Sequence, residues 1–371
     1  MNTKASLLAT ALGLAMFSSA SGQVVIDVTG STAGRSAVHG RIINLLTGVT
    51  FSWNGNASVT SATRAIYKGT YDGKAVTVRT FWSGSAAGVR DVANAPQLAA
   101  SYFDKATTPT GAEITSPVLA PASAETVSEI GFSDVFQSST AFTANPLADE
   151  SSVAVLPFLF MKNDGAPAVL TNVTANQFRA LYTALGEAPL SLFTGNIAHN
   201  STTVYATGRN NESGTRITVQ AETGTGVFAQ LAQYQGTGDP ATLSFVGNGG
   251  YSSGGNVSTL LGATLPAGQA LIGYIGVSDG ITAAAGGATY LTYNGVAYSE
   301  EAVRNGQYSM WGYLHQFSRN ISGATLGDGG TTQLFYNSLR AGLISTPGSG
   351  TIGIETMKVE RAADGATITP K

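Results

Sequence analysis

One stretch of the chain sets the fold class: TVYATGRNNESGTR, at residues 203–216. Its β-branched and aromatic start predicts a buried strand, and the Gly/Ser/Thr turn that follows predicts a helix within 217–231. A strand that turns into a helix in this way directs free backbone N–H groups toward an anion. Two arginines, Arg209 and Arg216, add positive charge at the same place. A single turn of this kind is also explained by ordinary helix capping, so the surrounding sequence must decide.

Two further strands end at similar turns. VVIDV at 24–28 leads into TGSTAG at 29–34, and a helix with one apolar face follows. A hairpin over 61–82, with its turn at Asp72-Gly73, leads into SGSAAG at 83–88. Several helix N-termini directed at one point make an anion site, whereas one does not. The sequence therefore predicts that these turns meet.

Strands and helices alternate along the rest of the chain. The expected strands are 130–134, which ends on the carboxylate of Asp134, and 154–161, 271–276 and 288–293, with a helix over 175–185 capped by Thr174. This alternation predicts an α/β fold with mainly parallel sheets. Ligands of such folds bind at the carboxyl ends of the strands, which is where the turns lie.

Composition excludes several classes of protein. The chain has 371 residues, 43% hydrophobic and only 11% charged, with a net charge of −3 and no cysteine. Disulfides, thiolate metal sites and cysteine nucleophiles are therefore excluded, and the negative charge disfavours nucleic acid as a partner. The three histidines show no metal-ligand spacing, and neither a Gly-x-Ser-x-Gly elbow nor a nucleotide P-loop is present. We expect no catalytic residues, no metal, no cofactor and no enzymatic activity.

The N-terminus has the pattern of an export signal. Lys4 precedes a short apolar run at 5–17, and small residues follow at 18–20. We expect residues 1–22 to be a cleaved signal peptide and the mature protein to be periplasmic. Beyond it, no run of 18 apolar residues occurs, so membrane insertion is not expected.

The order of the turns resembles that of the periplasmic phosphate-binding proteins of ABC-type phosphate transporters. The most specific match is Arg209-x-x-x-Ser213-Gly214-Thr215, which is similar to the anion loop of that family. Gly30-Ser31-Thr32-Ala33 is similar to its N-terminal loop, Ser83-Gly84-Ser85 to its second loop, and Phe132-Ser133-Asp134 to the strand that carries its ligand-binding aspartate. The resemblance covers most of the chain after residue 22, with a longer segment before Asp134 than the family has.

This resemblance implies a set of ligand-binding residues and a ligand, inorganic phosphate or a similar oxyanion. The set is Ser31, Thr32, Ala33, Ser83, Ser85, Asp134, Arg209, Ser213, Gly214 and Thr215, with the choice between Ser83 and Ser85 left open. Arg209 offers a charged fork to the anion. An ionised Asp134 accepts a hydrogen bond from the P–OH group that phosphate keeps near neutral pH. It repels sulfate, which has no such proton.

The resemblance also implies two lobes, the first formed by 23–156 with 310–371 and the second by 157–309. The crossovers between them would form a hinge, and a ligand would close the cleft. An ABC permease is then the expected partner. The alternative is an exported surface or matrix protein that uses the same fold without a role in transport, because abundant Gly, Ser, Thr and Asn suit both.

Overall fold

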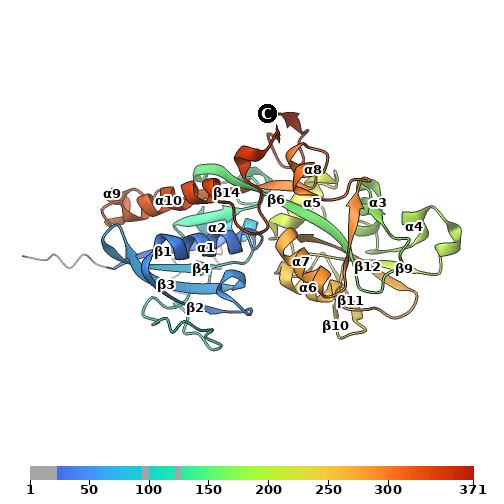
Figure 1. The fold of residues 1–371 in the computed structure, drawn as a ribbon, viewed down its shortest axis with the longest axis horizontal. Helices are drawn as coiled ribbons and strands as arrows, with labels where there is room; N and C mark the ends of the chain where they lie inside the picture. The colour runs from blue at the N-terminus through green and yellow to red at the C-terminus, as the bar shows by residue number, and fades with distance from the viewer. Residues whose placement is uncertain (1–22, 94–99, 122–126) are drawn as a thin grey trace, which may run out of the picture.

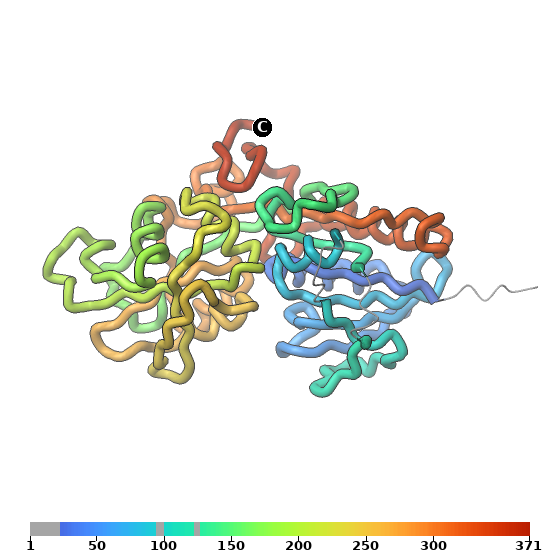
Figure 2. Tube along the Cα trace, turned by 180° about the vertical axis from the view of Figure 1, so that it is seen from behind, coloured from blue at the N-terminus to red at the C-terminus, as the bar shows by residue number. Residues whose placement is uncertain are grey.

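The computed structural model describes residues 23–93, 100–121 and 127–371. They form two lobes that lie side by side, with the C-terminal segment above their junction (Figures 1 and 2). The predicted signal peptide, residues 1–22, lies outside the described residues.

The first lobe is built on a sheet with the strand order β2-β3-β4-β1-β5-β14-β6. Its strands are β1 (Val24–Gly30), β2 (Thr47–Asn54), β3 (Arg64–Tyr71), β4 (Lys74–Phe81), β5 (Ile130–Ser133), β14 (Trp311–Ser318) and the first part of β6 (Ala148–Lys162). Its helices are α1 (Arg35–Leu45), α2 (Ser85–Val92), α9 (Gly323–Leu326) and α10 (Thr331–Ser345). The central strands β4, β1 and β5 are parallel, so their carboxyl ends meet at one edge of the sheet.

The second lobe continues the sheet through the rest of β6 to β12, β9 and β8. Its strands are β7 (Asn172–Val173), β8 (Glu187–Pro189), β9 (Thr203–Thr207), β12 (Gln269–Gly276) and β13 (Thr289–Tyr293), with a separate hairpin of β10 (Gln233–Thr237) and β11 (Thr242–Gly247). Its helices are α3 (Ala175–Tyr182), α4 (Ser191–Thr194), α5 (Gly214–Glu222), α6 (Gly254–Leu261), α7 (Val277–Ala285) and α8 (Glu300–Arg304). Strands β9 and β12 are parallel.

Strand β6 belongs to both lobes. Up to Pro157 it pairs with β14, and from Phe158 onward it pairs with β12. Pro157, which has no N–H to donate, is the last residue of β6 that pairs with β14. The second connection runs beside β6 here, because the Phe158 N–H donates to the Met310 carbonyl at 2.9 Å.

The α/β fold class is confirmed, and the local predictions agree with most of the elements. The Asp72-Gly73 hairpin forms between β3 and β4, and Thr174 and Gln177 form a capping box at the start of α3. Two details differ. The sheet is mixed, because β6 and β14 run antiparallel to their neighbours. Helix α5 begins at Gly214 and ends at Glu222, earlier than predicted, because the Ser213 side chain caps it at the turn itself.

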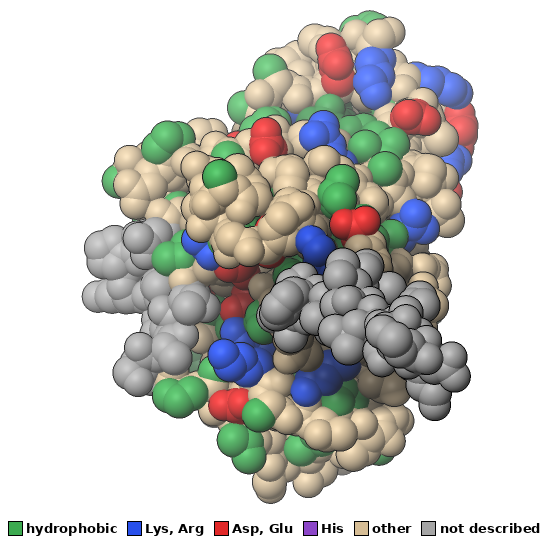
Figure 3. Space-filling model, turned by 90° about the vertical axis from the view of Figure 1, so that its left-hand side faces the viewer, with side chains coloured by type: hydrophobic (Ala, Val, Ile, Leu, Met, Phe, Trp, Pro, Cys, Tyr) green, Lys and Arg blue, Asp and Glu red, His purple; other side chains and the backbone are tan. Residues whose placement is uncertain are grey.

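The surface reflects the low charge of the chain. On the face drawn in Figure 3, uncharged polar side chains and backbone cover most of the area, and charged groups of both signs lie in small sets. Within the described residues, no helix is both long and apolar enough to cross a membrane.

A candidate anion-binding site between the lobes

The turns predicted to meet do meet, at the interface of the two lobes. Loops after β1, β4 and β5 come from the first lobe, and the loop after β9 comes from the second. We call their polar side chains the cradle, defined as Ser31, Thr32, Ser85, Asp134, Arg209 and Thr215. All six residues are at most 6% exposed.

Asp134 lies at the centre of the cradle, directly after β5. The Ser31 hydroxyl donates to its carboxylate, and its own N–H donates to the Ser85 hydroxyl at 3.0 Å. Burial raises the pKa of Asp134 to about 6, and its hydrogen bonds with Ser31, Ser85 and Thr215 and the charge of Arg209 oppose that rise. The carboxyl group is therefore poised to exchange a proton near neutral pH.

The first loop is shaped by its glycine. Gly30 has φ +127°, and a Cβ there would lie 2.0 Å from the Phe132 carbonyl oxygen, so β1 and β5 approach too closely for any side chain. Ser31 follows, and its hydroxyl also accepts from the N–H groups of Ala33 at 3.1 Å and Gly34 at 3.0 Å. These bonds hold the Ser31 hydroxyl beside Asp134.

The second loop places one of its two serines in the cradle. Ser85 is fully buried, begins α2 and contacts Asp134. The Ser83 hydroxyl is buried and has no hydrogen-bond partner among the described residues. The geometry therefore brings Ser85, rather than Ser83, to the aspartate.

Arg209 reaches the cradle from the opposite lobe. Its side chain donates to the carbonyls of Tyr251 at 3.1 Å and Ser252 at 2.8 Å, which fixes the direction of the guanidinium. The same group donates across the interface to the Thr32 hydroxyl at 3.0 Å. Burial lowers the pKa of Arg209, while Asp279 and Asp134 oppose that change, so carboxylates on two sides stabilise its charge.

The start of α5 packs directly on the first lobe. A Cβ at Gly214 would lie 2.2 Å from the Ser85 hydroxyl oxygen and 2.7 Å from the Asp134 Cβ. Only glycine permits this approach, which brings Thr215 within hydrogen-bonding reach of Asp134. Ser213 caps the helix by accepting from the Arg216 N–H at 3.4 Å, so it shapes the loop rather than facing Asp134.

Arg216 supports the loop from behind. It is 2% exposed and donates to the carbonyls of Asn248 at 2.9 Å and Arg209 at 3.3 Å. Its guanidinium is thus bound to backbone oxygens, which leaves Arg209 as the arginine of the cradle.

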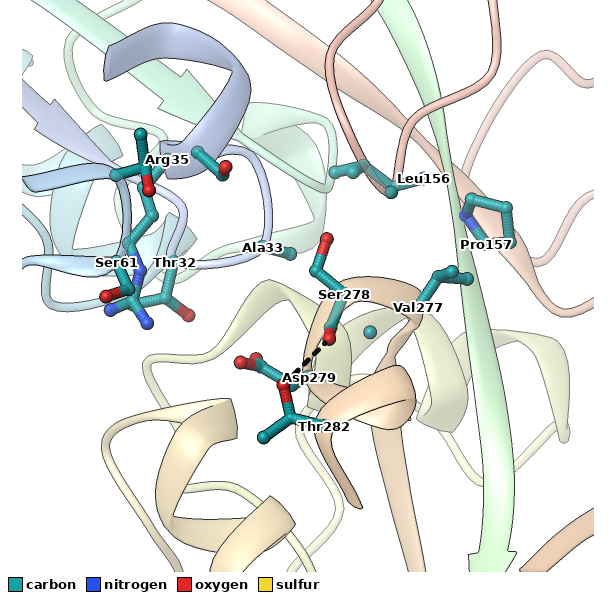
Figure 4. Close-up of a pocket in the computed structure, with 14 residues that line it drawn as sticks. Thr32, Ala33, Arg35, Ser61, Leu156, Pro157, Val277, Ser278, Asp279 and Thr282 are labelled. Carbon is teal, nitrogen blue, oxygen red and sulfur yellow. Dashed lines mark hydrogen bonds between the residues drawn. The ribbon is translucent and has the colours of Figure 1, made fainter. Parts of the chain in front are cut away.

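Sequence reasoning missed three residues at this interface. Tyr274 lies on β12, and its hydroxyl accepts a hydrogen bond from the backbone N–H of Arg209 at 3.1 Å. Arg35 and Asp279 line a cavity beside the cradle (Figure 4). Asp279 follows β12 at the same edge of the sheet as the other loops. Its position just after a predicted strand is the sequence feature from which it could have been predicted. Arg35 carries a similar signal, because it begins α1 directly after the turn that follows β1.

Two buried histidines lie outside the cradle. Among the described residues, no group of three or more His, Asp or Glu side chains is placed to hold a metal ion. Burial lowers the pKa of His39 to about 3 and that of His315 to about 3, so both rings are neutral parts of the core.

Comparison with known proteins supports the fold. No protein-family model matches the chain, and no curated protein matches its sequence. Among solved structures, it is similar to a protein described as a phosphate ABC transporter substrate-binding protein, from Clostridium perfringens, crystallised with phosphate bound. The TM-score is 0.51 and the identity 16%, over 89% of this chain and 99% of the other. An ABC-type phosphate transport receptor from Vibrio cholerae has a TM-score of 0.48 and 12% identity, over 88% and 99% of the two chains. The chain therefore has the two-lobed fold of the Clostridium substrate-binding protein.

Proposed function

We propose that this chain is an extracytoplasmic solute-binding protein that captures phosphate between its lobes for an ABC transporter. The observation that carries the proposal is the cradle, in which a buried carboxylate from one lobe and a buried arginine from the other meet among hydroxyl groups. The Clostridium protein of the same fold, crystallised with phosphate bound, supports the choice of ligand.

The chemistry of the cradle suits an anion that carries a proton. Arg209 supplies positive charge, and the hydroxyls of Ser31, Thr32, Ser85 and Thr215 and the N–H groups of their loops supply donors. Asp134 supplies an acceptor for the P–OH of phosphate. Sulfate has no proton to donate at neutral pH, so an ionised Asp134 would repel it.

The proposed lobes are 23–156 with 310–371, and 157–309, joined by a two-stranded hinge. The change of partner in β6 at Pro157, beside Met310, supports these limits. Ligand bound between Asp134 and Arg209 would stabilise the closed arrangement of the lobes, which a permease would recognise. The proposed export of the protein rests on the signal-like sequence of residues 1–22.

Thermal unfolding of ligand-stripped protein tests this function. At about 100 times the dissociation constant a ligand stabilises a protein by about 2.7 kcal/mol, which raises the midpoint by a few degrees. We expect this shift with phosphate and none with sulfate at pH 7.5. Equal shifts of the unfolding midpoint with both anions would contradict the proposed selectivity for phosphate. No shift with either anion would refute the proposed ligand.

A further inference from the structure

A second compartment lies beside the cradle. It is a cavity of about 140 Å³ between the lobes, and we call it the side cavity. The first lobe lines it with Thr32, Arg35 and Ser61, and the second with Ser278, Asp279 and Thr282 (Figure 4). Its walls therefore carry one positive charge, one negative charge and several hydroxyl groups.

Arg35 is the unusual member of this wall. It is the first residue of α1 and is 5% exposed. Among the described residues its guanidinium makes no hydrogen bond and no ion pair, although it points into the side cavity (Figure 4). Its N–H donors therefore remain available to a group in the side cavity that accepts hydrogen bonds.

Asp279 faces Arg35 from the other lobe. The two side chains point toward one another in Figure 4 and attract through space, because Asp279 opposes the fall in the pKa of Arg35 caused by burial. They form no direct ion pair, so the space between them is open to a third group. A Cβ at Gly254 would lie 2.0 Å from a carboxylate oxygen of Asp279, so the absence of a side chain there leaves room for this carboxylate.

The side cavity adjoins the cradle. Thr32 lines the cavity and also accepts a hydrogen bond from Arg209. The Arg209 guanidinium interacts with Asp134 on the side of the cradle and with Asp279 and Arg35 on the side of the cavity. A group attached to an anion in the cradle could thus extend past Thr32 into the side cavity.

The charges of the side cavity select the kind of group. A carboxylate would be attracted by Arg35 but repelled by Asp279, and an ammonium group would be attracted by Asp279 but repelled by Arg35, so neither fits both walls. A hydroxyl group satisfies both, since it accepts from the arginine and donates to the aspartate. The volume has room for only a few heavy atoms, because one water in the liquid occupies about 30 Å³.

We propose that the side cavity binds the hydroxylated organic part of a small phosphate monoester whose phosphate lies in the cradle. The proposal rests on the function proposed above and extends its ligand from phosphate to a phosphate ester of a short polyol. Arg35 and Asp279 are the residues that determine this specificity.

Calorimetric titration of the ligand-stripped mature chain tests the proposal at pH 6, where about half of a phosphate monoester keeps the proton that Asp134 requires. The three probes are inorganic phosphate, glycerol 3-phosphate and n-propyl phosphate. The two esters have similar length, but only the first carries hydroxyl groups on its carbon chain. We expect glycerol 3-phosphate to bind at least tenfold more tightly than propyl phosphate. Arg35→Met and Asp279→Asn should each reduce that ratio to less than threefold, because a change in the electrostatic field at the cradle acts on both esters alike and cancels in the ratio.

Lys68→Met is the matched control, because Lys68 is a cation on β3 outside both the cradle and the side cavity. It should keep the full ratio, and thermal unfolding should show that all variants are folded. If phosphate binds but glycerol 3-phosphate has no advantage over propyl phosphate, the side cavity has no such role and the proposed function stands. Failure of all three probes to bind would overturn the proposed function and this inference with it.

Discussion

The two lobes contribute opposite chemistry to the cradle. The first lobe supplies an acceptor, the buried carboxylate of Asp134, with Ser31 and Ser85 around it. The second supplies a cation, Arg209, held by the carbonyls of Tyr251 and Ser252. Within the cradle, neither lobe alone presents both a cation that attracts an anion and a carboxylate that accepts a hydrogen bond from its proton. Binding and selection are therefore assigned to different lobes, and variants of each lobe should fail in different ways.

Removing the cation of the second lobe should have the largest effect. Arg209→Met deletes the charged hydrogen bonds to the anion, each worth about 1.5–3 kcal/mol, so phosphate affinity should fall about a hundredfold. Calorimetric titration measures this, with circular dichroism to check folding and Lys68→Met as the control. Retained affinity in a folded Arg209→Met protein would show that the anion does not lie in the cradle.

Removing the charge of the first lobe should change selectivity more than affinity for anions in general. Asp134→Asn keeps the shape but replaces the charged acceptor for the phosphate proton with a neutral amide, and it removes the repulsion of sulfate. The ratio of phosphate to sulfate affinity should fall by at least about tenfold, as measured by titration of both anions at pH 7.5. An unchanged ratio would show that the Asp134 carboxylate does not determine the preference for phosphate over sulfate.

Acidification should mimic that substitution. Burial raises the pKa of Asp134 to about 6, so below pH 6 the carboxyl group is protonated, uncharged and able to donate. Sulfate affinity of the natural sequence should therefore rise as the pH falls through 6, by at most about tenfold per pH unit, since one unit corresponds to about 1.4 kcal/mol. The Asp134→Asn variant should lack this rise. A similar rise in both proteins would assign the titration to another group.

The two serines of the second loop should show the smallest effects and the sharpest contrast. Ser85→Ala removes a hydroxyl that contacts Asp134 and should weaken phosphate binding about fivefold to tenfold, the value of one hydrogen bond. Ser83→Ala removes a hydroxyl without a partner among the described residues and should change affinity less than about twofold. The reverse order of effects would mean that the loop rearranges when the anion binds.

Local patterns predicted the loops well, whereas the approach of distant parts of the chain could not be predicted. Asp72-Gly73 predicted its hairpin because both residues tolerate positive φ, which they adopt at 51° and 70°. Asp134 and Arg209 were proposed from the resemblance of their loops to those of a known family, and each follows a strand of the sheet. The extended β6, shared by both lobes, was foreseen only as a strand over 154–161, because nothing local shows where a strand changes partners.

The pair of Arg35 and Asp279 shows the same limit. The two residues face each other only because the lobes pack as they do, and no spacing in the sequence records that packing. A helix that begins with arginine is ordinary by itself. Its position opposite Asp279 in the side cavity is what gives Arg35 meaning, and that position becomes visible only in the assembled fold.

The central claim is that the cradle binds phosphate and rejects sulfate. Its most direct test is calorimetric titration of the ligand-stripped natural protein with phosphate and with sulfate at pH 7.5. We predict saturable binding of phosphate at one site per chain and no measurable binding of sulfate. Binding of both anions with equal affinity, or of neither, would contradict the pairing of an acceptor lobe with a cationic lobe.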